Sequence, residues 1–259
     1  MAIDPKTLRE AQLIMLEMLV EFDAVCKQHA LTYWLDSGTL LGAVRHKGFI
    51  PWDDDIDIAM PLEDYRALAR LPKEVFSDTI FFQTKKTDPK FPFDYMKLRS
   101  NKATIIEFHE QNKTADYHQG VFVDIFPMLS VKKSPFHQWY YKSSLALIRF
   151  FSHKNLHVRT SIPNDTLRSL LSWTLQKMHQ QESPQHTQLI YGGEMPDVAA
   201  WFDAKEVFPL AKIRFEDAEF YAPKNAHHYL SAIYSFDYMQ LPPEDKRTIH
   251  AHDVIIHTR

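Results

Sequence analysis

The sequence is poor in cysteine and glycine, and both shortages narrow its interpretation. Its 259 residues include one cysteine, Cys26, so neither an internal disulfide bond nor a cysteine-rich zinc site can form. Six glycines are present, and four of them fall within or beside the two motifs described below: Gly38, Gly42, Gly48 and Gly120. A scarce residue that gathers in this way indicates backbone positions with a special role.

Long apolar runs and an excess of one charge are also missing. No stretch reaches the ~18 consecutive apolar residues of a membrane-spanning helix. The formal net charge is −3, which is not the basic footprint of a nucleic-acid-binding protein. The first residues, Met1 to Pro5, have neither the basic start nor the apolar run of a secretory signal. We therefore expect a cytoplasmic globular protein that does not bind nucleic acid.

The most informative stretch runs from Trp34 to Met60. Its pattern predicts a short buried strand over 33–36, a helix that opens at Ser37-Gly38-Thr39, a turn, and a second strand over 53–60. Because strand side chains alternate between faces, three aspartates would share one face and three apolar residues the other. The acidic set is Asp53, Asp55 and Asp57, and the apolar set is Ile56, Ile58 and Met60.

Paired carboxylates on a core strand repel each other and are costly to desolvate, and a divalent cation removes that cost. Oxygen ligands favour Mg²⁺ or Mn²⁺ over zinc. We therefore expect Asp55 and Asp57 to bind metal, with Asp53 and Asp54 in the ligand shell behind them or simply exposed. A calcium-binding EF-hand loop has similar acidic spacing but needs glycine at its sixth position, where this chain has Ile58.

A second acidic position lies in the apolar run from Gly120 to Pro127, which predicts a buried strand. Asp124 stands in its middle, between Val123 and Ile125. An isolated carboxyl group there does not favour stability. If this strand neighbours the first one, Asp124 completes a cluster of three carboxylates.

The predicted helix start at Ser37, Gly38 and Thr39 has unpaired amide groups that can bind phosphate. Its alternative interpretation is an ordinary helix cap. Arg45 and Lys97 are candidate phosphate ligands, and exposed surface cations are the alternative for both. The fourteen histidines are scattered, and His227-His228 and His250-x-His252 have no clear geometric context, so we interpret most histidines as surface residues.

Further helices are expected over 5–29, 61–71, 135–151 and 167–178, and after Pro223 through Leu230 and Tyr234, with further strands over 79–84, 95–99 and 104–108. The aromatic segment 135–151 is typical of core packing or a partner interface. With Lys142 and Arg149 it also has some character of a membrane-surface helix.

The motif from Ser37 to Asp57 resembles the LicD family, which is related to fukutin and belongs to the nucleotidyltransferase-like superfamily. Five further motifs agree and extend the resemblance over most of the chain: Lys97-Leu-Arg, 120–127, Phe215-Glu216, Ala222-Pro223 and Asp237-Tyr-Met-Gln-Leu-Pro-Pro243. One departure is visible, because the family often has Tyr-Gly where this chain has Tyr234-Ser235.

The resemblance implies a mixed α/β (α+β) fold in one domain spanning 1–259. A nucleotidyltransferase-like core at about 30–130, with a small mixed sheet flanked by helices, would precede a largely helical accessory region at 131–259. It also implies a catalytic, metal-binding set of Asp55, Asp57 and Asp124, with Mg²⁺ or Mn²⁺ as cofactor. The predicted substrate-binding residues are Ser37, Gly38, Thr39, Arg45 and Lys97.

The implied activity is transfer of phosphocholine from CDP-choline to a hydroxyl group of a cell-surface glycan, a teichoic acid or lipopolysaccharide precursor, with release of CMP. Alternatives are another CDP-alcohol or nucleotide-sugar donor, an Asp-x-Asp glycosyltransferase, and a scaffold without catalysis. Choline would need an aromatic cage, for which Trp34, Trp52, Tyr95 and Tyr117 are candidates. A lipid-linked acceptor would bring the protein to the inner face of the plasma membrane as a peripheral contact.

Overall fold

The structure is a computed structural model that describes residues 3–110, 115–152, 164–179, 187–193, 195, 200–247 and 249–257. The α-helices among these residues are α1 (Pro5–Gln28), α2 (Ser37–Arg45), α3 (Leu62–Leu68), α4 (Pro135–Ser152), α5 (Asn164–Gln176), α6 (Ala204–Val207) and α7 (Ala226–Tyr234). The strands are β1 (Trp34–Leu35), β2 (Ile56–Pro61), β3 (Ile80–Gln83), β4 (Met96–Glu107), β5 (Gly120–Lys132), β6 (Thr187–Tyr191), β7 (Trp201–Asp203), β8 (Ala211–Phe215), β9 (Ala218–Ala222) and β10 (Ala251–Ile256).

The central sheet has the strand order β1-β2-β5-β4-β10, with β3 paired to β4, β6 paired to β5, and β7 paired to β6. The β2–β5 pair is parallel, and the other pairs in this sheet are antiparallel. This arrangement confirms the predicted mixed α/β fold with a mixed sheet flanked by helices. The parallel pair at its centre is the feature that positions the candidate site.

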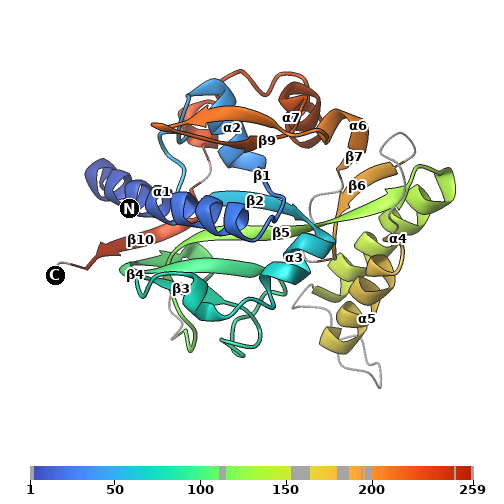
Figure 1. Ribbon diagram of the computed structural model, residues 1–259, viewed down its shortest axis with the longest axis horizontal. Coiled ribbons are helices and arrows are strands. Elements are labelled where there is room, and N and C mark those ends of the chain that lie inside the picture. The colour runs from blue at the N-terminus through green and yellow to red at the C-terminus, as the bar shows by residue number, and fades with distance from the viewer. Residues whose placement is uncertain are drawn as a thin grey trace.

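Helix α1 covers one face of the sheet, where it contacts β4, β5 and β10 (Figure 1). Asp4 caps it by accepting a hydrogen bond from the Thr7 amide, and Pro5 occupies its first turn. Its buried side includes Met15, Leu19 and Phe22, at spacings of four and three residues. The three-to-four-residue periodicity read from the sequence therefore identified the face that packs on the core.

Figure 1 also shows two smaller groups beside the sheet. One contains α2, α7 and the β8–β9 hairpin, which contact one another or β1. The other is the α4–α5 pair, which has its own apolar cluster beneath it, formed largely by Leu129, Tyr141, Leu145 and Ile148. No helix among the described residues is long and apolar enough to cross a membrane.

In its described residues the carboxy-terminal half contains more helix than strand, but it also contributes strands that the sequence did not predict. Strands β6 and β10 join the central sheet, and β8 pairs with β9 in a separate hairpin. These short strands carry weak alternation, whereas the helices that were predicted have clear periodicity. Strand β4 likewise joins two segments that we expected to be separate strands, 95–99 and 104–108.

The Phe215-Glu216 motif holds the turn after α2. Glu216 accepts hydrogen bonds from the Phe49 amide at 3.0 Å and from the Arg9 guanidinium at 2.6 and 3.0 Å. Its carboxyl group lies so close to Gly48 that a Cβ there would come within 2.4 Å of Oε1. Glycine at 48 therefore allows the close approach that fixes this turn.

Ser235, which replaces the expected glycine, has a glycine-like backbone. Its φ and ψ angles are 77° and 179°, a region occupied almost only by glycine. We expect Ser235→Gly to raise the free energy of unfolding by about 1 kcal/mol, because relief of backbone strain exceeds the added entropy of the unfolded chain. Chemical denaturation measures this change.

Ser231→Gly is the matched control, because Ser231 lies inside α7. Glycine in a helix interior lowers stability, by about 0.5–1 kcal/mol. If both substitutions destabilised the protein equally, Ser235 would not be strained.

Candidate active site

The site is built on the parallel pair β2–β5. Asp57 of β2 lies directly beside Asp124 of β5 in the strand register. Neighbouring residues on paired strands point to the same face, so the two carboxylates lie on one side of the sheet. The structure therefore brings Asp57 and Asp124 together as the sequence predicted.

Asp53, Asp54 and Asp55 do not belong to the strand, which begins at Ile56. The expectation that Asp53, Asp55 and Asp57 alternate along one strand was therefore wrong in part. Asp54 is 1% exposed, and its carboxyl group accepts hydrogen bonds from the backbone amides of His250 and Ala251. The segment that leads into β2 is therefore fixed by its contact with the start of β10. Alternation in the local sequence could not reveal this contact.

The acidic groups raise one another's pKa values. Burial, followed by the charges of Asp55 and Asp124, raises the pKa of Asp57 well above its usual range. Burial and the charge of Asp54 raise the pKa of Asp55 to about 7. Burial and the charge of Asp55 act in the same direction on Asp53. Several carboxylates are therefore held close together with too little positive charge among the protein groups around them.

Lys97 supplies part of that positive charge. Its Nζ lies 2.9 Å from Oδ1 and 3.3 Å from Oδ2 of Asp124, and only the longer contact has hydrogen-bond geometry. Both side chains are nearly fully buried, and the ammonium group lies 3.3 Å from the centroid of the Phe122 ring. Burial raises the pKa of Asp124, while Lys97 opposes that rise. Lys97 is thus paired with a carboxylate rather than exposed on an edge strand.

Helix α2 begins at Ser37, as predicted, and is capped by Asp36. The fully buried Asp36 carboxyl group accepts hydrogen bonds from the hydroxyl groups of Tyr191 and Tyr229 and from the Ser37 amide, at 2.8–2.9 Å. Burial raises its pKa to about 6, and these hydrogen bonds oppose the rise. Two tyrosines more than 150 residues away in the chain therefore fix the helix start.

The helix start is also fixed against the acidic cluster. Thr39 Oγ1 accepts a hydrogen bond from the Asp57 amide at 2.8 Å, and the Asp36 amide donates to the Asp57 carbonyl oxygen at 3.0 Å. A Cβ at Gly38 would lie 3.1 Å from Oδ2 of Asp53. The predicted phosphate-binding segment thus directly adjoins the predicted metal ligands.

Arg45 has a structural task that the sequence did not indicate. Its Nη1 donates to the carbonyl oxygens of Tyr238 and Gln240 at 3.0 and 3.2 Å. The guanidinium group therefore ties α2 to the Asp237-Tyr-Met motif. Burial lowers the Arg45 pKa, and the charge of Asp53 opposes part of that shift.

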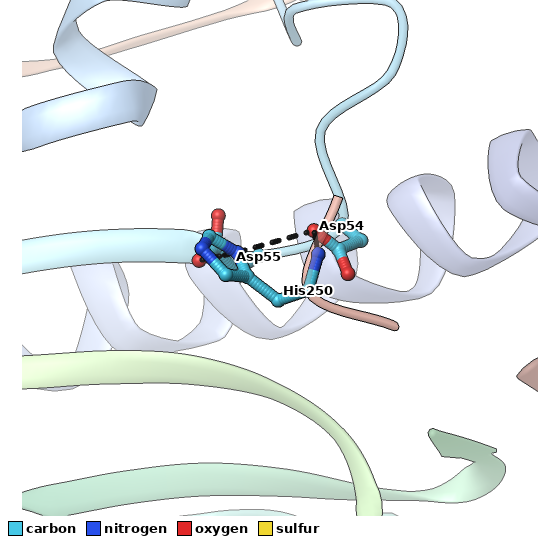
Figure 2. Close-up of side chains that lie close together, drawn as sticks. All are labelled: Asp54, Asp55 and His250. Atoms are coloured by element: carbon cyan, nitrogen blue, oxygen red, sulfur yellow. Dashed lines mark hydrogen bonds and ion pairs between the residues drawn. The ribbon is translucent and has the colours of Figure 1, made fainter. Parts of the chain in front are cut away.

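His250 is the site residue that sequence reasoning missed. Its Nδ1 lies 3.5 Å from Oδ1 of Asp54 and 3.6 Å from Oδ2 of Asp55 (Figure 2). The pKa of His250 is raised to about 9, and its interaction with Asp54 is the largest cause. Its position nearly 200 residues after Asp54 leaves no local signal.

A divalent cation fits the chemistry of these residues. Among the described residues, ligand atoms of Asp54, Asp55 and His250 come within 4.8 Å of one another. The ligand atoms of the predicted trio, Asp55, Asp57 and Asp124, do not converge in this way. Asp54 already accepts two backbone amides, so it is a poor free ligand. The crowded carboxylates supply the oxygen donors that Mg²⁺ and Mn²⁺ prefer, and His250 adds a nitrogen donor at the edge.

The candidate choline-cage residues differ in how available they are. Trp34 is fully buried and donates to Tyr229, and Tyr117 donates to Glu110. The Arg247 guanidinium lies 4.2 Å from the Trp52 ring centroid, so a cation already stacks there. Tyr95, which directly precedes β4, is the remaining candidate, although a cation also lies near it, with Lys97 Nζ 5.5 Å from its ring centroid.

In the absence of divalent cations, the burial and mutual repulsion of the carboxylates should make the stability of the protein depend on pH. The Asp55 pKa is about 7 in the folded protein, against an ordinary aspartate value of 3.8. Its contribution to the free energy of unfolding is therefore complete below pH ~4 and is lost as the pH rises to about 7. We expect Asp55→Asn to be more stable than wild type at about pH 8, by on the order of 2 kcal/mol.

Guanidinium chloride unfolding with a chelator at about pH 5 and pH 8 tests this, since the gain should be small at the lower pH. Asp116→Asn, at an exposed ion pair with Lys90, is the control. Added Mg²⁺ should stabilise wild type and not Asp55→Asn. An equal gain at both pH values would show that repulsion is not its source.

Several known proteins resemble this chain in sequence. A family model described as LicD/FKTN/FKRP, nucleotidyltransferase domain, matches residues 30–150. Lipopolysaccharide cholinephosphotransferase LicD of Haemophilus influenzae is 31% identical over 262 residues, which cover 94% of this chain and 96% of that protein. Human ribitol 5-phosphate transferase FKRP is 50% identical over 40 residues, which cover 15% of this chain and 8% of that protein.

A short segment also matches an uncharacterised protein of Rickettsia prowazekii, which is 46% identical over 48 residues, or 18% of each chain. The short matches are local, whereas the match to the Haemophilus protein spans nearly the full length of both chains. On that similarity, together with the family match over the segment that carries Asp55, Asp57 and Asp124, the chain belongs to the LicD family.

Proposed function

We propose that this protein transfers phosphocholine from CDP-choline to a hydroxyl group of a lipopolysaccharide or teichoic acid precursor and releases CMP. The observation that carries the proposal is the pair Asp57–Asp124 on adjacent parallel strands, beside the start of α2. Phosphoryl transfer depends mainly on positioning and on neutralising charge, and these elements serve both purposes. The nearly full-length similarity to a lipopolysaccharide cholinephosphotransferase supports the choice of phosphocholine and glycan.

Each group has a proposed task. Asp55, Asp57 and Asp124 would hold a divalent cation, with His250 beside them, once the carboxylates draw together around it, because their ligand atoms do not converge within 4.8 Å in the free protein. When bound, Mg²⁺ or Mn²⁺ neutralises the diphosphate and stabilises the departing CMP. The amide groups of Gly38 and Thr39 bind phosphate oxygens at the helix start, and Ser37 contributes its hydroxyl group, because its amide already donates to Asp36.

The acceptor hydroxyl group must lose a proton as it attacks phosphorus. Asp124 is our proposed acceptor for that proton, because Lys97 favours its ionised form at a buried position. In the free protein, Lys97 therefore stabilises the negative charge of the Asp124 carboxylate. Arg45 would contribute to phosphate binding only through Nη2, since Nη1 is engaged by two carbonyl oxygens and Nε donates to His46.

We further propose that the chain acts as one domain on the cytoplasmic side of the membrane. The catalytic core would comprise about 30–130 and the accessory region 131–259. The accessory region supplies β6 and β10 of the central sheet, Tyr191 and Tyr229 to Asp36, and His250 to the acidic cluster. A core without these residues would lack groups that hold its own site.

A second donor class is favoured by the local similarity to ribitol 5-phosphate transferase, which covers 40 residues. CDP-ribitol and CDP-glycerol carry the same nucleotide diphosphate but no quaternary ammonium group. They would use the same acidic cluster and helix start, and would dispense with the aromatic ring of Tyr95. Direct donor titration separates these alternatives.

We expect calorimetry to show Mg²⁺-dependent binding of CDP-choline that exceeds the binding of CDP-ribitol and CDP-glycerol. Asp55→Asn should abolish the Mg²⁺ dependence. Stronger binding of CDP-ribitol would retain the mechanism and change the substrate. Absence of metal-dependent binding to all three donors would contradict the enzyme proposal and favour a scaffold.

Asp57→Asn and Asp124→Asn should each lower the rate of CMP release at least about 10²-fold, because each removes a group that acts at the reacting phosphate. The measurement is CMP formation with CDP-choline and a glycan acceptor. Asp116→Asn should retain the wild-type rate. Pyrophosphate in place of CMP would indicate attack at the other phosphorus, as in nucleotidyl transfer.

A further inference from the structure

Helix α4 has two apolar sides. One side packs inward, where Tyr141, Leu145 and Ile148 are no more than 1% exposed. The other carries large apolar residues that remain exposed: Phe136 at 66%, Trp139 at 64%, Leu147 at 46% and Phe150 at 46%. These positions recur with Ser143 at intervals of three and four residues, so they form one stripe along the helix. We call these four apolar residues the α4 stripe.

The neighbouring helix extends the same character. Leu170 and Trp173 of α5 are 52% and 54% exposed, and α5 packs against α4. Lys177 Nζ lies 5.0 Å from the centroid of the Trp173 ring. The pair of helices stands at the edge of the molecule beyond the end of β5 (Figure 1).

The charge of α4 indicates what kind of surface suits the stripe. The helix contains Lys142 and Arg149 and no aspartate or glutamate. At 100° per residue, Lys142 lies beside the stripe and not on the buried side. Exposed tryptophan and phenylalanine flanked by cations are typical of helices that lie in the headgroup region of an anionic membrane.

A second copy of the chain fits this surface less well. A stable interface between two proteins usually uses roughly 20–30 residues on each side. Among the residues of α4 and α5 whose side chains the structure describes, the exposed large apolar ones are the six named above. A shallow insertion of a few aromatic side chains needs no larger area.

We propose that the α4 stripe docks the protein on the surface of a membrane that contains anionic lipids. The docking itself rests on the exposure and charge of α4, and only its purpose rests on the proposed function. Strand β5 connects this surface to the site, because Asp124 and Lys132 are the middle and end of one strand and α4 follows at Pro135. Eight residues of strand span about 26 Å, so a lipid-linked glycan would reach the site through its sugar chain.

The test is co-sedimentation of the full chain with vesicles of phosphatidylglycerol and phosphatidylethanolamine, compared with phosphatidylcholine alone, without donor nucleotide. Wild type should bind the anionic vesicles. Phe136→Ser with Trp139→Ser should lower the partition coefficient at least about tenfold. Lys142→Glu should weaken binding to anionic vesicles several-fold and leave any binding to phosphatidylcholine unchanged.

Leu13→Ser with Val20→Ser is the matched control, because both residues are exposed on α1 at 44% and 47%. Absence of vesicle binding by wild type, or equal binding by the Phe136/Trp139 variant, would overturn the proposal. A dimer in sedimentation equilibrium that the same variant abolishes, without vesicle binding, would assign the stripe to a second copy and also overturn it. Vesicle binding without donor binding would support the docking surface while contradicting the proposed transfer.

Discussion

The structure depends on one constraint, which is that carboxylates are crowded on the parallel pair β2–β5. Asp57 and Asp124 occupy neighbouring register positions, and Asp53 and Asp55 lie at the approach to β2. Burial raises the pKa of each of them, and the charges of neighbouring aspartates add to the rise for Asp53, Asp55 and Asp57, a sign of unfavourable electrostatics in the free protein. The surrounding chain must hold them together against this repulsion, and most of the long-range contacts around the site have this effect.

Segments from the second half of the chain hold the first half in place. The backbone at the start of β10 binds the Asp54 carboxyl group, two tyrosines bind the Asp36 carboxyl group, and Glu216 fixes the turn near Gly48. Arg45 reaches in the opposite direction, from α2 to the carbonyl oxygens of 238 and 240. The chemistry of the motif from Ser37 to Asp57 is therefore local in sequence, but its geometry is set by distant residues.

This division explains how much the sequence could predict. Alternation and periodicity located α1, α2, β2 and β5 within a few residues, and an acid inside an apolar run singled out Asp124. The parallel register that places Asp124 beside Asp57 confirmed the expected neighbourhood. His250, Tyr191 and Tyr229 carry no local pattern, since their partners lie 155–196 residues away. For Arg45 and Lys97, a cation looks the same in the sequence whether it faces solvent, a carbonyl oxygen or a carboxylate, and only packing distinguishes these cases.

The position of β5 joins the chemistry to the proposed docking surface. One strand carries Asp124 among its buried residues, pairs with β2 on one side and β4 on the other, and then leads into α4. A rigid sheet strand transmits position better than a loop, so the α4 stripe would fix the orientation of the acidic cluster relative to a lipid surface. In this arrangement the length of β5, and not the reach of a flexible linker, would set how far from the lipid an acceptor hydroxyl group must lie. A docked enzyme of this kind would select acceptors by the distance of the hydroxyl group from its lipid anchor as well as by the chemistry of the sugar.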